Sequence, residues 1–144
     1  MIEIYTASWF AQLPDGIVRV GVSRGVPRGQ PAGYRRYTKL NPGSWFNSVG
    51  SEEYLRRYKA EVLGRLMPDQ VAKDLEALTG GKPAALLCYE SPLRIEAGSQ
   101  WCHRHIVAAW LEHHLGIKVE EVDYPQLDRF AQLKREGVSP PTFG

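Results

Sequence analysis

The sequence contains no long hydrophobic run, and none of its apolar stretches approaches the ~20 residues that a helix needs to span a bilayer. Residues 1–5 lack the basic segment and the apolar core of a secretion signal. We therefore expect a cytoplasmic protein without a membrane partner. Cysteine is also scarce: Cys88 and Cys102 are the only two, and their spacing excludes a C-x-x-C redox motif. In the cytoplasm both are expected to be reduced thiols.

Acidic residues are absent from residues 16–51. The same stretch carries six basic residues, namely Arg19, Arg24, Arg28, Arg35, Arg36 and Lys39. The net charge of +2 for the whole chain is too small to imply nucleic-acid binding. Local charge of one sign can attract an anionic ligand, or it can simply be a solvated loop that helps solubility. Both interpretations stay open.

The length and the composition are those of one globular domain. The 144 residues are 43% hydrophobic and 24% charged, which is ordinary for a soluble protein with a sizeable core. Apolar patterns and flanking Gly and Pro residues predict strands at 2–7, 17–23, 84–90 and 118–123. Helical periodicity and capping residues predict helices at 51–66, 68–80, 103–115 and 127–133.

This order of elements predicts a single α/β domain over residues 1–138. The stretch 84–90 is apolar without alternation, which is typical of a central parallel strand covered on both faces. We therefore expect a mainly parallel central sheet flanked by helices, in a three-layer, Rossmann-like arrangement. Residues 139–144 are expected to form a flexible tail.

The segment 24–50 is rich in glycine and proline, so long regular elements cannot run through it. It also carries aromatic residues such as Trp45, which a disordered segment rarely has. These features predict an ordered, functional loop packed on the body of the domain. Tyr34 and Tyr37 are candidates to stack on a base or another ring, although packing within the loop is the simpler explanation.

Residues 102–105, Cys-His-Arg-His, open the third predicted helix. A helix N-terminus and nearby cationic side chains lower the pKa of a thiol, so Cys102 is the candidate nucleophile. The alternative is that Cys102 is a small buried hydrophobic residue. Cys88 lies inside an apolar strand, where we expect it to be buried and unreactive, with a role as resolving thiol as the alternative.

Four further side chains are expected near Cys102. His103 is a candidate acid–base group or a hydrogen-bonded core histidine. Glu90 ends the central strand, at the edge where α/β proteins bind ligands, and is a second acid–base candidate. Arg104 opposes the helix dipole, which is explained if it binds an anion or pairs with an acid such as Glu90. Arg24 follows the second strand, so Arg24 and Glu90 are expected at one edge of the sheet.

No metal ligand is assigned, and the sequence names no cofactor. Structural zinc needs four converging ligands. Only Cys102 and His105 have a workable spacing on the helix, because His113 and His114 lie roughly 15 Å farther along its axis.

Several motifs of the chain together resemble a known family. The most specific are Leu86-Leu87-Cys88-Tyr89-Glu90 and the later Cys102-His103-Arg104-His105, which is followed by Trp110-Leu111. Supporting matches lie at residues 4–6, 23–27, 37–42 and 80–83. In these motifs the chain resembles the domain-of-unknown-function family 488 (DUF488).

The resemblance implies a small α/β domain without an established reaction. It also implies a signature site made of Cys88, Glu90, Cys102, His103 and Arg104. The connection between Glu90 and Cys102 is longer here than is usual in the family, so it is expected to reshape the pocket.

These observations favour an enzyme that acts on a phosphate-bearing or nucleotide-like substrate. Cys102 is then the thiolate, Glu90 and His103 are the acid–base groups, and the substrate is bound by Arg24, Arg104 and Tyr37. The alternative is a non-catalytic module that binds nucleic acid or a nucleotide through the basic, aromatic loop 19–46. A third possibility is a structural cluster in which Arg104 and Glu90 form a buried pair.

Overall fold

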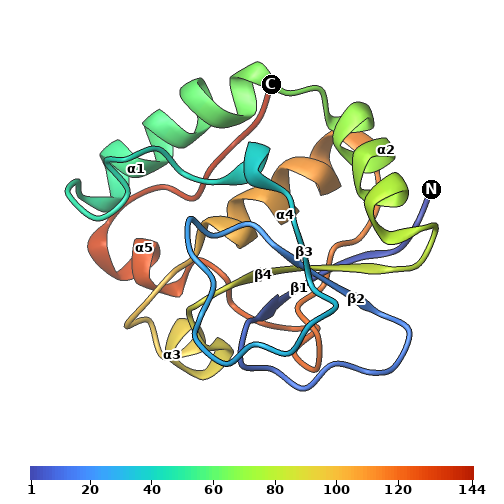
Figure 1. The fold of residues 1–144 in the computed structure, drawn as a ribbon. Coiled ribbons are helices and arrows are strands. Elements are labelled where there is room, and N and C mark those ends of the chain that lie inside the picture. The colour runs from blue at the N-terminus through green and yellow to red at the C-terminus, as the bar shows by residue number, and fades with distance from the viewer.

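Four parallel strands form the centre of the fold, in the spatial order β1–β4–β2–β3 (Figure 1). The computed structural model describes all residues from 1 to 144. The strands are β1 (Ile4–Ser8), β2 (Val18–Gly21), β3 (Arg35–Arg36) and β4 (Ala84–Cys88). The predicted α/β class and parallel sheet are confirmed.

Strand β4 lies inside the sheet because its side chains are apolar on both faces. Every residue of Ala84–Cys88 is buried. The strand pairs with β1 on one side and β2 on the other, and Ala84 is level with both Ile4 and Val18. The uninterrupted apolar run therefore correctly predicted a central parallel strand.

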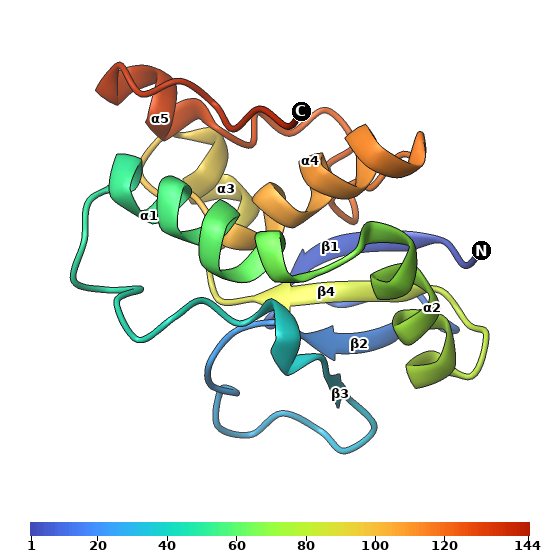
Figure 2. The ribbon, with the colours of Figure 1, turned by 90° about the horizontal axis from the view of Figure 1, so that it is seen from above.

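Helices cover one face of this sheet. They include α1 (Ser51–Arg57), α2 (Pro68–Thr79) and α4 (His103–Leu115), which lie together on that face (Figures 1 and 2). A π-helical turn (Tyr58–Val62) and a 3-10 turn (Leu63–Arg65) continue α1, which agrees with one predicted helical segment. Helix α2 starts at a proline and ends at Gly80 in the left-handed conformation, as its sequence indicates.

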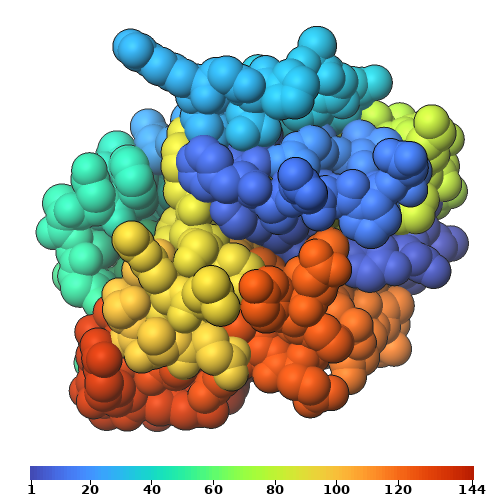
Figure 3. Space-filling view, turned by 90° about the horizontal axis from the view of Figure 1, so that it is seen from below, coloured from blue at the N-terminus to red at the C-terminus, as the bar shows by residue number.

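The opposite side of the molecule is turned toward the viewer in Figure 3, where the N-terminal segments appear in blue, the segment that includes α3 in yellow and the chain near residue 120 in orange. A smaller apolar cluster lies there, made of Ala7, Trp9, Ala85 and Leu87. Its further contacts come mostly from the segments that connect the strands, including Leu13, Val26 and Tyr34, and also from Val122 after α4. This uneven covering does not confirm a three-layer, Rossmann-like arrangement, which stays a prediction.

The predicted strand at 118–123 is wrong. Only Glu121 forms a bridge to β1, opposite Thr6, and the chain then turns back so that Glu121 also bridges Tyr124. Asp123 takes a positive φ of 68° in this turn, which ends the extended conformation after one paired residue. The turn therefore limits the pairing of this segment to one residue.

Two helices differ from expectation. Helix α5 (Ala131–Glu136) begins later than the predicted 127. Helix α3 (Pro92–Glu96) was not predicted, although Ser91 accepts a hydrogen bond from the Arg94 amide and Pro92 occupies the first turn. A serine followed by a proline is a helix-start signal, which the short length of this helix concealed.

The last residues of the chain contact the helical layer. Phe143 packs beside His113 and His114, and the carbonyl of Thr142 accepts a hydrogen bond from Lys59. The division into a domain of residues 1–138 and a flexible tail stays a prediction. None of the helices is long and apolar enough to cross a membrane.

Replacing Gly21 by alanine should destabilise the fold. A Cβ atom there would fall on the indole ring of Trp9, which is buried and donates a hydrogen bond to Ser23 Oγ at 2.9 Å. We expect a loss of about 1–3 kcal/mol in the free energy of unfolding, measured by chemical denaturation. Gly50→Ala is the control, because no atom lies within 4 Å of its added Cβ. Equal losses in both variants would contradict this account.

Candidate functional site

A cavity of about 680 Å³ opens at the C-terminal ends of β2 and β4. Its walls come from the segments that follow these two strands, from the start of α1, from Trp101 and His103 at the start of α4, and from α5. Ligand sites of parallel α/β sheets lie at this edge. The structure brings Arg24 and Glu90 into this one cavity, as their positions after β2 and β4 predicted.

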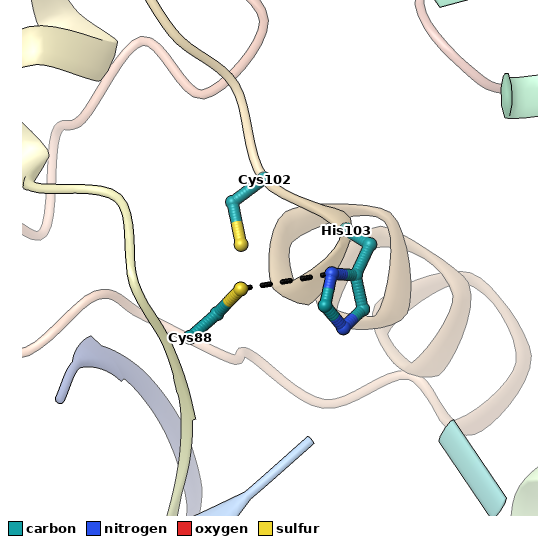
Figure 4. Close-up of side chains that lie close together, drawn as sticks. All are labelled: Cys88, Cys102 and His103. Carbon is teal, nitrogen blue, oxygen red and sulfur yellow. Dashed lines mark hydrogen bonds between the residues drawn. The ribbon is translucent and has the colours of Figure 1, made fainter. Parts of the chain in front are cut away.

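Three chemically active side chains meet at the inner end of the cavity: Cys88, Glu90 and His103, called the floor from here on. The Sγ atom of Cys88 lies 3.7 Å from His103 Nδ1, as Figure 4 shows. It also lies 3.7 and 3.8 Å from the two carboxylate oxygens of Glu90. The Cys88 thiol is therefore in contact with both a carboxyl group and an imidazole.

The ring of His103 is held in a defined orientation. Its Nε2 atom lies 2.9 Å from the carbonyl oxygen of Val22. A carbonyl oxygen only accepts, so Nε2 carries the proton and the Nδ1 atom of the neutral ring presents a lone pair to Cys88. Burial lowers the pKa of His103, but Cys102, the Val22 carbonyl and Glu90 outweigh it and raise the pKa overall.

Cys102 differs from the sequence-based expectation. It is only 1% exposed and does not line the cavity, and its sulfur accepts a hydrogen bond from the Arg104 amide at 3.4 Å. Burial and then the contact with Cys88 raise the pKa of this thiol, outweighing Arg104 and His103. An accessible Cys102 thiolate with a lowered pKa is therefore not what the structure contains.

Cys88, rather than Cys102, is the cysteine that reaches the cavity. We expected it to be buried in a strand, and it is only 3% exposed. It is nevertheless the last residue of β4, so its side chain lies at the ligand-binding edge of the sheet. Its place at the end of the strand was the signal that sequence reasoning missed.

Glu90 is largely buried in the cavity wall. Burial, together with the neighbouring Cys102, raises the pKa of its carboxyl group to about 7, against the opposing effects of Arg104 and His103. Its backbone carbonyl accepts a hydrogen bond from Arg104 Nη2 at 2.9 Å. The position of Glu90 is thus tied to the first turn of α4.

Arg104 does not bind in the cavity and does not pair with the Glu90 carboxylate. Its side chain is fully buried and forms two hydrogen bonds with Glu121, from Nε at 3.1 Å and from Nη2 at 2.8 Å. Glu121 also lies 2.8 Å from His105 Nε2 and accepts a bond from Thr6 at 2.7 Å. Sequence reasoning missed Glu121 because it is distant along the chain, and the adjacent Glu120 gave no way to tell which of the two acids is buried.

These four residues, Thr6, Arg104, His105 and Glu121, are called the Glu121 network from here on. Burial works against the charge of Glu121, but hydrogen bonds from His105 and Arg104 outweigh it and lower its pKa to about 2. Burial lowers the pKa of His105 to about 4, so its ring is neutral at pH 7. The network therefore holds one positive and one negative charge out of water.

Tyr37, expected to bind substrate, is a core residue instead. It is buried in the main hydrophobic cluster, and its hydroxyl donates a hydrogen bond to Asp74. The aromatic side chains that line the cavity are Phe46, Tyr54, Tyr89 and Trp101. Spacing along the chain could not separate these from Tyr37, because which aromatic side chain faces the cavity depends on how distant segments pack together.

The arginines of the basic loop mainly hold the loop itself. Arg19 donates to the carbonyls of Trp9 and Ala11. Arg36 donates to those of Ser23 and Arg24. Nucleic-acid binding by the loop 19–46 stays a prediction, with its expected stacking residue Tyr37 facing the core.

One group of side chains in the site could hold a metal ion. The ligand atoms of Cys88, Cys102 and His103 all lie within 4.8 Å of one another. The workable helical spacing of Cys102 and His105 does not produce a ligand pair, because the ring of His105 is turned to Glu121. The grouping requires two elements to meet, so spacing on one helix could not reveal it.

Glu121→Gln should strongly destabilise the protein, because it leaves the buried guanidinium of Arg104 without its counter-charge. We expect a loss of about 3–5 kcal/mol in the free energy of unfolding. The pKa of Glu121 is lower in the folded than in the unfolded chain, so its contribution is complete above pH 4.5 and is lost as the pH falls toward 2. The difference in the free energy of unfolding between Glu121→Gln and the wild type should therefore become smaller as the pH falls from 4.5 toward 2. Urea denaturation measures this difference.

Glu53→Gln is the matched control. Glu53 forms an exposed ion pair with Arg57 one turn away, and such pairs contribute about 0.3–0.5 kcal/mol. A loss at Glu121 no larger than that at Glu53 would show that the buried pair does not stabilise the fold.

The comparisons with known proteins agree with the motifs of the site. No curated protein and no solved structure matches the chain. A family model, DUF488-N3a, described as the active DUF488-N3 subclade, matches residues 2–115. This range contains β1 to β4, the floor of the cavity and the whole of α4. Because the match covers well over half of its length, the chain belongs to the DUF488 family.

Proposed function

We propose that this protein is an enzyme that acts on a planar, nucleotide-like substrate carrying an anionic group. The observation that carries the proposal is the meeting of Cys88, Glu90 and His103 at the floor of the cavity. A thiol that contacts both a carboxyl group and an imidazole can take part in activating a nucleophile and in moving protons. The description of the matching subclade as active is consistent with this.

The floor is where the reaction takes place. Cys88 and His103 activate the nucleophile of the reaction. The contact of His103 Nε2 with the Val22 carbonyl keeps the Nδ1 atom of His103 directed at Cys88. Glu90 borders the same space with both carboxylate oxygens near Cys88 Sγ, so it is placed to exchange a proton with the reacting group.

The walls of the cavity favour a flat ring. Trp101 and Tyr54 meet edge to face, with ring centroids 4.7 Å apart, and the Trp101 indole N–H is held by Ser51 Oγ at 3.1 Å. Phe46 lies on the wall as well and is 41% exposed. Aromatic faces of this kind stack on any base, which makes them suitable for a nucleotide-like ring.

Arg24 is placed to bind the anionic group. Its guanidinium is exposed, lies 5.7 Å from the centre of the Phe46 ring and donates one hydrogen bond, to the Pro42 carbonyl at 3.0 Å. A guanidinium has five N–H donors in all, so several stay free for a phosphate or a carboxylate. Of the three side chains expected to bind the substrate, Arg24 therefore keeps this role in the proposal, whereas Arg104 and Tyr37 do not.

Cys102 and Arg104 act as supports in this proposal. Cys102 packs behind Cys88, and Arg104 holds the backbone of Glu90. Neither lines the cavity, so neither is expected to touch the substrate.

The proposal predicts that substitutions of Glu90 on the floor and of Arg24 on the cavity wall change different kinetic constants. A panel of nucleosides and nucleoside mono-, di- and triphosphates is incubated with the protein, and products are separated by liquid chromatography. For a substrate found in this way, Glu90→Gln should lower kcat by about 100-fold or more, because proton transfer is lost. Arg24→Ala should raise KM by about tenfold and leave kcat nearly unchanged, because only a charged contact is lost.

The control is Arg28→Ala, since Arg28 is exposed and does not line the cavity. Melting temperatures should be equal in all variants. Full turnover in a folded Glu90→Gln variant would remove Glu90 from the reaction. Binding of a nucleotide without any turnover would contradict the enzyme and favour the non-catalytic module.

A further inference from the structure

We propose that Cys88, Cys102 and His103 together bind a zinc ion, with the fourth coordination position directed into the cavity. The two thiolates come from different elements, one at the end of β4 and one at the start of α4. Zinc binding itself does not depend on the proposed function, whereas its use as the source of the nucleophile rests on that function.

The separations of the ligand atoms fit a tetrahedral zinc site. Bond lengths of about 2.3 Å to sulfur and 2.0–2.1 Å to nitrogen place a sulfur and a nitrogen ligand roughly 3.6 Å apart. The distance between Cys88 Sγ and His103 Nδ1 is 3.7 Å. Cys102 Sγ completes the group within 4.8 Å and points toward Cys88, as Figure 4 shows. Small side-chain adjustments therefore suffice to bind the ion.

The surroundings orient two of the three ligands. A histidine that binds a metal usually donates its other ring N–H to a carbonyl or a carboxylate, and His103 Nε2 has this contact with Val22 at 2.9 Å. The Arg104 amide lies 3.4 Å from Cys102 Sγ and donates to it, which stabilises negative charge on that sulfur. These contacts exist without the metal, so the site is largely preformed.

The ligand types select zinc among common divalent ions. Thiolate and imidazole ligands favour zinc over magnesium and calcium, which prefer oxygen. Binding breaks two S–H bonds, releases two protons to solvent and forms two Zn–S bonds, so the two thiolates neutralise the ion. This gives a role to two buried cysteines that otherwise form no disulfide.

The fourth position faces the space where the substrate is expected. Three protein ligands with one open position are typical of catalytic zinc, whereas structural zinc has four protein ligands. Cys88 and His103 line the cavity, and Glu90 lines it beside them without belonging to the close ligand group. A water molecule in the fourth position would lie near Glu90, which is placed to accept its proton. In zinc deaminases a glutamate that is not a ligand has this task.

The experiment measures metal content and coordination without relying on activity. The full chain is freed of metal with a chelator and a reductant, and Zn²⁺ or Co²⁺ is added back. We expect one ion per chain by elemental analysis, and a sulfur-to-cobalt charge-transfer absorption with Co²⁺. Cys102→Ser should lower the affinity for Zn²⁺ by at least 100-fold and weaken this absorption, because one thiolate is removed.

His113→Asn is the matched control, because His113 is outside the ligand group and should leave metal uptake unchanged. His103→Asn provides a second test should Cys102→Ser not fold. Wild-type protein that takes up no Zn²⁺ or Co²⁺ would overturn the proposal. So would a mass two hydrogens lower in freshly purified, metal-free protein, because that mass indicates a disulfide between Cys88 and Cys102.

The two proposals can fail separately. Turnover by metal-free protein that still depends on Glu90 would overturn zinc as the source of the nucleophile and keep the enzyme. Stoichiometric zinc without turnover of any nucleotide would keep the zinc site and contradict the enzyme.

Discussion

The site depends on the buried ion pair between Arg104 and Glu121. Two hydrogen bonds join the guanidinium to the carboxylate in a region closed to water, and His105 and Thr6 complete the carboxylate's contacts. A buried pair is costly to desolvate, but an unpaired buried charge is far more costly. The pair therefore strongly disfavours any arrangement in which the first turn of α4 moves away from β1. Cys102 adjoins that turn, as does Glu90 through its carbonyl bond to Arg104.

With α4 held in this way, the edge of the parallel sheet becomes the place where reactive groups gather. Strands β2 and β4 end together, so the segments after them face one cavity. The carbonyl of Val22, just after β2, orients His103, while β4 supplies Cys88 and leads to Glu90. Backbone and side chains of three segments thus support each other, which explains how a short chain positions several functional groups.

The zinc proposal and the enzyme proposal use the same floor in different ways. Cys88 and His103 activate the nucleophile in both proposals. When zinc is bound, the nucleophile is a water molecule on the metal rather than a free thiolate. Cys102 then has a chemical task despite being closed to solvent, because a metal ligand needs no contact with substrate. Glu90 keeps its place beside the reacting centre in either case.

By itself the sequence determined where the main elements lie and at which edge of the sheet Arg24 and Glu90 come together. Proline, glycine and apolar patterns act on neighbouring residues, so they predicted α2, β4 and the start of α4. Which sulfur reaches the cavity was decided only by tertiary structure, as were the pairing of Arg104 with Glu121 and the placing of Tyr37 in the core. These outcomes depend on burial and on contacts between residues far apart in the chain. The convergence of Cys88 with Cys102 and His103 has the same origin, because it exists only once β4 and α4 pack together.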